Sequence, residues 1–138
     1  MASGIYNRWK ANVMNKVVDM EADTIKVMLL DNTHTFNADH DVIGDVSANE
    51  ISGTGYSAGG ATLANKTVTQ DDTNDRAVFD ADDSQWTTAT FDAYHAVIWD
   101  DTVATDDLIC SIDFGGIKSV VAGTFTIQWN SGGIIRIA

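Results

Sequence analysis

The sequence predicts a mostly β protein: an antiparallel β-sandwich of jelly-roll type with one N-terminal α-helix. Six or more segments after residue 24 alternate apolar and polar residues, as half-buried strands do. Short turns rich in Gly, Asn and Asp separate these segments in a chain without proline. A parallel sheet would need helical crossovers, and no helical periodicity follows Met20. The 138 residues suit a single domain, which we place at 1–138.

The N-terminal segment 1–20 is predicted to form a helix over residues 5–19 or an arm. Four apolar residues recur every four positions and predict one buried stripe. They are Ile5, Trp9, Val13 and Val17. Ser3 is the candidate N-cap. The helix packs either on its own domain or on another subunit, so all four stripe residues are candidates for a protein interface.

The first strand is predicted in "TIKVMLL", where Ile25, Val27 and Leu29 share one face. Residues 32–60 are polar and contain few apolar residues, which predicts a long surface excursion. Loops of this length in a compact domain usually have a function.

Further strands are predicted in "ATLANKTVTQ", "RAVFDA", "TFDAYHAVIWDD", "LICSIDFGG" and "GTFTIQWN". Alternation in the third of these places five residues on one face: Phe91, Ala93, His95, Val97 and Trp99. "NSGG" predicts a hairpin turn, with "IIRIA" as its return strand.

The stretch "ISGTGYSAGG" at 51–60 contains the spacing of a dinucleotide fingerprint in Gly53, Gly55 and Ala58. Such a site needs a helix after the loop, and "ATLANKTVTQ" follows instead. We therefore expect no nucleotide here. The glycines allow a tight loop, Tyr56 anchors it through its ring, and its backbone contacts another chain. Ile51 and Tyr56 are the interface candidates.

The net charge of -12 disfavours nucleic acid as a partner. Residues 1–18 nevertheless carry Arg8, Lys10 and Lys16 and no acid. No apolar run reaches the roughly 18 residues that span a bilayer, and the N-terminus lacks the apolar core of a signal peptide. We expect a soluble protein made in the cytoplasm, with no membrane contact. A single cysteine, Cys110, excludes an internal disulfide.

Candidate catalytic residues are few. His34 and His40 fall in the acidic loop, His95 is interpreted as a core histidine, and Cys110 as a buried inert thiol. The sequence thus predicts no enzyme and no cofactor. The best calcium candidates are Asp80, Asp82 and Asp83, although acidic turns also keep strand ends solvated.

The tryptophans raise the alternative of a carbohydrate-binding module for host attachment. Trp99 and Trp129 alternate with polar residues as core positions do. Trp9 and Trp86 are the better candidates for an exposed contact surface.

Three long segments carry a resemblance. They are "YNRWKANVMNKVVDMEADTIKVMLLDNTHTF", residues 45–86 from "DVSANEISGTGYSAGG" to "DADDSQW", and "LICSIDFGG…GTFTIQWNSGGIIRIA". Together they span nearly the whole chain. They resemble a family of small virion structural proteins of tailed bacteriophages and their prophages, with the last segment as the closing hairpin.

The resemblance implies a non-enzymatic component of the particle. The short acidic chain, without a coiled-coil or collagen-like shaft, favours a capsid cement or decoration protein on the outer capsid surface. It would bind the major capsid protein or another virion protein as a homo-oligomer, with a trimer favoured. A tail, neck or head-fibre component is the main alternative.

Overall fold

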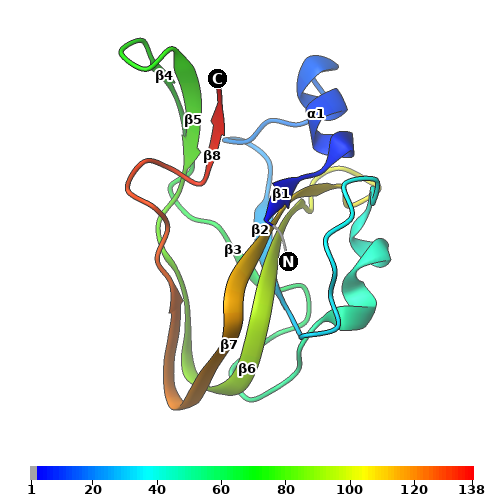
Figure 1. Ribbon diagram of the computed structural model, residues 1–138, viewed down its shortest axis with the longest axis vertical. Coiled ribbons are helices and arrows are strands. Elements are labelled where there is room, and N and C mark those ends of the chain that lie inside the picture. Colours follow the sequence, from blue (N-terminus) through cyan, green and yellow to red (C-terminus); the bar gives the residue numbers. More distant parts are fainter. Residues whose placement is uncertain (1–2) are drawn as a thin grey trace.

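The computed structural model describes residues 3–138, and strands dominate them (Figure 1). In chain order the elements are β1 (Gly4–Ile5), α1 (Asn7–Met14), β2 (Ile25–Leu30), the 3-10 helices η1 (Ile43–Asp45) and η2 (Ser47–Asn49), β3 (Ala61–Thr62), β4 (Thr67–Asp71), β5 (Arg76–Asp80), β6 (Ser84–Asp100), β7 (Leu108–Ile127) and β8 (Ile135–Ile137). The fold class predicted from the sequence, mostly β with one N-terminal helix, is confirmed.

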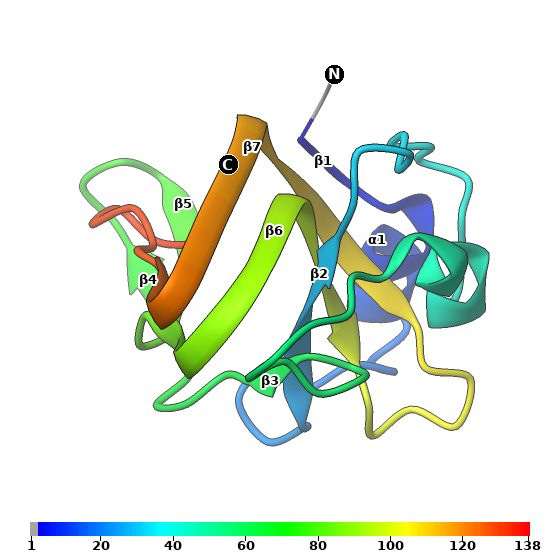
Figure 2. The ribbon, with the colours of Figure 1, turned by 90° about the horizontal axis from the view of Figure 1, so that it is seen from below.

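The strands form two antiparallel sheets. The larger has the order β1-β7-β6-β2-β3, and the smaller has the order β4-β5-β8. Figure 1 shows the small sheet and α1 at the same end of the molecule, and Figure 2, seen from below, shows the small sheet to the left of β6 and β7 and α1 to the right. A core cluster contains residues of both sheets, among them Ile25, Phe79 and Ile135.

The β6–β7 hairpin links the two layers. It is the longest ribbon of the fold, and it folds back on itself at the bottom of Figure 1. Thr88 and Ala122 have φ angles of 49° and 46°, and the register of the pair shifts between Trp86 and Ala89. Bulges of this kind bend a ribbon sharply. The two strands predicted after residue 108 are therefore one continuous strand.

The predicted alternation along β6 is wrong beyond Ala93. Ala93 pairs with Lys118 and His95 pairs with Asp113, so Tyr94 alone opposes four residues of β7. Such a shift moves the following side chains to the other face of the sheet. As a result, Phe91 and Ala93 belong to one core cluster, whereas Val97 and Trp99 belong to the other.

Strand β2 is buried on both faces. Ile25, Val27 and Leu29 share one face, as predicted, and lie in the core between the sheets. Met28 and Leu30 lie in a second cluster, which Val46 of the 32–60 excursion helps to cover. The excursion is thus long because it closes the outer face of the large sheet.

The N-terminal helix is shorter than predicted. Ile5 is in β1 and pairs with Cys110, and the helix is followed by Lys16 with a φ of 59°. Ser3 does not cap it, because its hydroxyl accepts a hydrogen bond from Asp113 N instead. The predicted buried stripe is also wrong: Trp9 is 4% exposed, but Val13 is 39% exposed and Val17 47%.

The C-terminal hairpin is not formed. "NSGG" does turn the chain, since Gly133 N donates to Asn130 O at 2.8 Å. The return strand β8, however, pairs with β5 rather than with β7. Pairing with the small sheet lets Ile135 enter the shared core, which a simple hairpin would not provide.

Gly60 should be irreplaceable by alanine. Its φ is 86°, and an added Cβ would overlap the carbonyl oxygen of Val27 in β2. Gly59 has a similar φ of 91°, but a Cβ there meets only the Trp99 ring at 3.6 Å. We expect Gly59→Ala to lower the free energy of unfolding by about 1–2 kcal/mol. Gly60→Ala should lower it by about 4 kcal/mol or more, because backbone must move. Urea unfolding of both variants measures the difference, and equal losses would contradict this packing.

Candidate functional site

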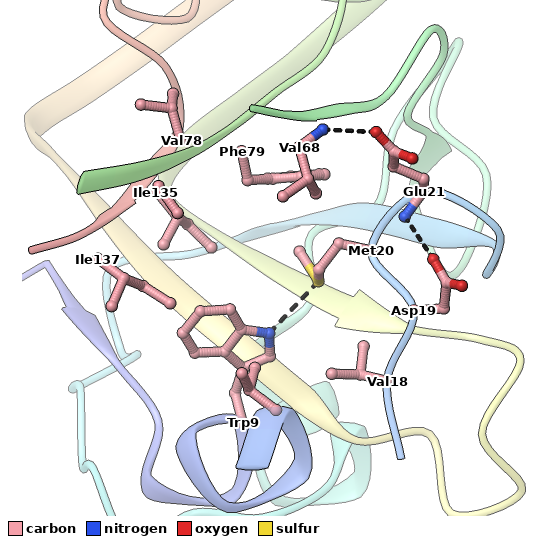
Figure 3. Close-up of a pocket in the computed structure, with 12 residues that line it drawn as sticks. Trp9, Val18, Asp19, Met20, Glu21, Val68, Val78, Phe79, Ile135 and Ile137 are labelled. Carbon is pink, nitrogen blue, oxygen red and sulfur yellow. Dashed lines mark hydrogen bonds between the residues drawn. The ribbon is translucent and has the colours of Figure 1, made fainter. Parts of the chain in front are cut away.

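An apolar hollow lies between α1 and the inner face of the small sheet. Its volume is about 310 Å³. Val68, Phe79 and Ile135 stand in register across β4, β5 and β8 and form one wall. Trp9 and Val13 of α1 lie opposite this wall and form the floor of the hollow, as Figure 3 shows for Trp9.

Trp9 is the fixed part of this site. Its indole N–H donates to the sulfur of Met20 at 3.3 Å, and both side chains are buried in the core. Trp9 therefore holds the segment around Met20, which follows α1, against the small sheet. The hollow thus has a rigid floor, whereas its other end is open to solvent.

A second hollow of about 400 Å³ adjoins the first. Trp9, Val13 and Ile137 line both hollows. The second is also lined by Lys10 and Met14 of α1, by Arg136 of β8, and by Ile5 and Ala138. We call the two together the α1–β8 groove.

Four of the large hydrophobic side chains that are exposed among residues 3–138 line this groove. They are Val13, Met14, Val68 and Ile137. Gathered apolar side chains at a rimmed hollow are typical of protein contact sites.

The two ends of the groove differ in charge. At one end, Glu21 accepts a hydrogen bond from Val68 N at 2.7 Å, and Asp19 accepts from the amides of Glu21 and Ala22. These amide bonds lower the pKa of Asp19. At the other end lie the cations Lys10 and Arg136.

This charge difference extends over the whole chain. Residues 1–18 and 114–138 contain five cations and no acid, whereas 19–113 contain three cations and all twenty acids. The second hollow is lined only by residues of the two acid-free segments. The fold thus brings the cationic segments together at one groove of an acidic molecule.

A cluster of polar side chains is buried elsewhere, beneath the 32–60 excursion. His34 Nε2 lies 3.1 Å from Ser111 Oγ, its ring meets the His95 ring edge-on at 5.1 Å, and His95 Nδ1 lies 3.8 Å from Asp113. Burial, and then the neighbouring His95, lower the pKa of His34 to about 4. His34 does lie in the predicted loop, but its side chain is buried rather than at the surface, and His95 is in the core as predicted.

This cluster contains the residue types of a catalytic site, but its serine is not accessible to a substrate. A nucleophile has to reach its substrate, and Ser111 is 1% exposed. Cys110 is also buried, as interpreted from the sequence, and burial raises the pKa of its thiol to about 12.

The glycine-rich loop is tied to its own domain. Glu50 Oε2 accepts hydrogen bonds from Tyr56 Oη and Gly59 N, each at 2.7 Å, and Tyr56 Oη in turn accepts from Leu29 N. Strand β3 follows the loop, not a helix. Tyr56 is an anchor, as predicted. Whether the half-buried Ile51 and Tyr56 also contact another chain stays a prediction.

The expectation of exposed tryptophans is wrong. Trp86 is buried among Tyr56, Phe91 and Phe125, and Trp9 is buried as described. Neither ring presents the flat exposed face that stacking on a sugar requires.

The three aspartates proposed for calcium do not converge. Asp82 accepts from the Asn65 amide, Asp83 accepts from Trp129 N, and Asp80 accepts from the amide of Ala81. Across residues 3–138, no group of three His, Cys, Asp or Glu side chains is arranged to hold a metal ion.

Comparison with protein-family models, curated proteins and solved structures found no match. Within residues 3–138, no helix has the length and apolar character needed to cross a membrane.

Sequence reasoning found one wall of the groove and missed the other. Trp9 and Val13 were interface candidates, whereas Val68, Arg136 and Ile137 were not. The absence of acids after Asp113 was the available signal. The absence of acids shows that the segment is unusual, but it does not show that the segment lies beside α1.

Replacing Trp9 should test its role as the floor of the groove. Trp9→Ala removes a buried ring and should lower the free energy of unfolding by about 3–5 kcal/mol. Val13→Ala, at a partly exposed position of the same helix, should cost less than about 1 kcal/mol. Thermal or urea unfolding measures both. Equal, small losses would mean that the ring is not packed as described.

Acid should destabilise the protein through His34. Its pKa of about 4 in the folded protein lies below its ordinary value of 6.5, so the unfolded chain takes up the proton first as pH falls. The free energy of unfolding therefore decreases from pH 6.5 to 4, by on the order of 1–3 kcal/mol.

A buried carboxyl acts in the opposite direction. Burial, and then a hydrogen bond with Asp23, raise the pKa of Asp100 to about 7, so its contribution decreases as pH rises. The contribution of His34 is therefore measured as the difference between wild type and His34→Gln in the free energy of unfolding as a function of pH. The contribution of Asp100 is the same in both proteins and cancels in this difference. Parallel profiles would contradict the assignment.

Proposed function

We propose that this chain is a non-enzymatic structural protein of a tailed bacteriophage particle, a cement protein that binds the assembled head. The observation that carries the proposal is the α1–β8 groove. It is an exposed apolar site with a cationic end on an otherwise acidic molecule. The resemblance of three long segments to small phage virion proteins supports the same role.

The mechanism would be mechanical. Each copy would bind across neighbouring subunits of the shell and add buried interface where internal DNA pressure strains their contacts. A rigid sandwich suits this task, because a partner that does not deform transmits load. The groove would supply the contact to the shell protein.

A homo-oligomer, with a trimer favoured, would multiply such contacts. Several weak single contacts made by linked subunits add up to firm binding. A second surface is available for contact between copies. β1 pairs with β7 only at Cys110 and Ser111, so the outer edge of β7 beyond them has no strand partner among residues 3–138, and Ile117 and Val121 are exposed there. An open strand edge readily pairs with another chain.

Particles that lack the protein should test the proposal. Shells should still assemble without it, but they should lose resistance to heat and release DNA at a lower temperature than complete particles. Adding the purified protein back should restore the resistance. Equal heat resistance with and without the protein would overturn the cement role. Particles without tails, or particles unable to adsorb to cells, would replace it with a tail or head-fibre role.

Two lysine substitutions should separate the groove from the rest of the surface. Val13→Lys places a charge in the groove at a partly exposed helix position, and should abolish binding to shells while the protein still folds. Val121→Lys alters an exposed apolar residue outside the groove, and a single subunit carrying it should still bind. Co-sedimentation with shells measures both.

A further inference from the structure

We propose that the α1–β8 groove binds an acidic–apolar peptide segment of a different protein: a bulky apolar side chain fills the hollow beside Trp9, and a neighbouring carboxylate binds Lys10 and Arg136. This inference names the chemistry of the occupant. It is independent of whether the partner belongs to a virion.

The two cations at the groove have no carboxylate partner of their own. Ion pairs within residues 3–138 occupy Arg8, Lys26 and Arg76. Lys10 reaches only the side-chain oxygen of Asn7, at 3.3 Å. In a chain with twenty acids, two cations without an internal carboxylate partner at one hollow leave room for an anion from outside.

The Arg136 side chain is held in place for this role. Its Nε donates to Gly132 O at 2.8 Å and one Nη donates to Asn130 Oδ1 at 3.1 Å. Its guanidinium lies so close to Gly132 that a Cβ there would overlap it. A guanidinium has five N–H donors in a fixed plane, and a carboxylate is the group that best fits those left free.

The apolar part of the groove suits a single anchoring side chain. Trp9 forms a rigid floor, and Val68, Phe79 and Ile135 form a wall fixed by the sheet. Interfaces gain most of their affinity where a bulky side chain enters such a preformed pocket. The acids at the far end, Asp19 and Glu21, accept backbone hydrogen bonds, and the ion pairs formed within residues 3–138 do not join them to Lys10 or Arg136.

A second copy of this chain does not offer the required segment. Outside the groove, its exposed large hydrophobic side chains in residues 3–138 are Val17, Ile117 and Val121. Lys16 precedes Val17, and Lys118 lies between the other two. The carboxylate nearest Val17 is that of Asp19, which already accepts from the amides of Glu21 and Ala22. Their insertion would bring a lysine toward Lys10 and Arg136, and like charges oppose that contact.

Selection of short random peptides displayed on yeast, with the purified chain as bait, tests the proposal. We expect enrichment of peptides that place Asp or Glu beside a bulky apolar residue. Val13→Lys should weaken their binding by about tenfold or more, since it removes the apolar pocket, whereas Val121→Lys should not change it. Lys10→Glu and Arg136→Glu should each weaken binding, with Lys118→Glu as the matched control. Thermal unfolding checks that each variant is folded.

Several results would overturn the inference. No enrichment, enriched peptides without acids, or binding that Val13→Lys leaves intact would each do so. A concentration-dependent dimer that Val13→Lys dissociates would show that a second copy fills the groove. Because the selection uses the isolated chain, its failure is distinct from the failure of the particle experiment.

Discussion

The bend of the β6–β7 ribbon is the constraint on which the rest of the structure depends. At Thr88 and Ala122 the paired strands turn back together, so one hairpin contributes to both layers. Strands β1 and β2 pair with this ribbon, whereas β5 leads into it and β8 follows it, and the two sheets share a common core. The small sheet therefore lies at one end of the ribbon, where α1 and the segment 18–21 cover part of its inner face. The groove exists because that helix is too short to fill the space.

The local elements of this fold could be predicted from the sequence, and the long-range pairings could not. Period-two alternation located β5 and the first part of β6, because burial on one face leaves that pattern. It also located β2, although both faces of that strand are buried. The end of α1 depends on the left-handed Lys16, and the face change in β6 depends on three extra residues in β7. Neither has a marker in its own segment, because each arises from the partner strand or from tertiary packing.

The candidate site shows the same division. Apolar spacing identified Trp9 and Val13 on α1, since residues four apart lie on the same face of a helix, although only Trp9 is buried. Ile137 and Arg136 join them only because β8 pairs with β5 instead of closing a hairpin with β7. The prediction that Trp86 is an exposed contact residue was wrong, since a large aromatic side chain in a polar stretch can equally well pack into the core.

Charge then decides what the groove admits. The acid-rich part of the chain, residues 19–113, carries all twenty acids and repels other acidic proteins over most approaches. An acidic partner is favoured only near the acid-free segments, where Lys10 and Arg136 line the same hollow. Orientation would thus come from charge and affinity from the apolar pocket. Salt weakens the attraction between charges far more than it weakens the apolar contact. High salt should therefore slow the association of a partner more than it speeds its release.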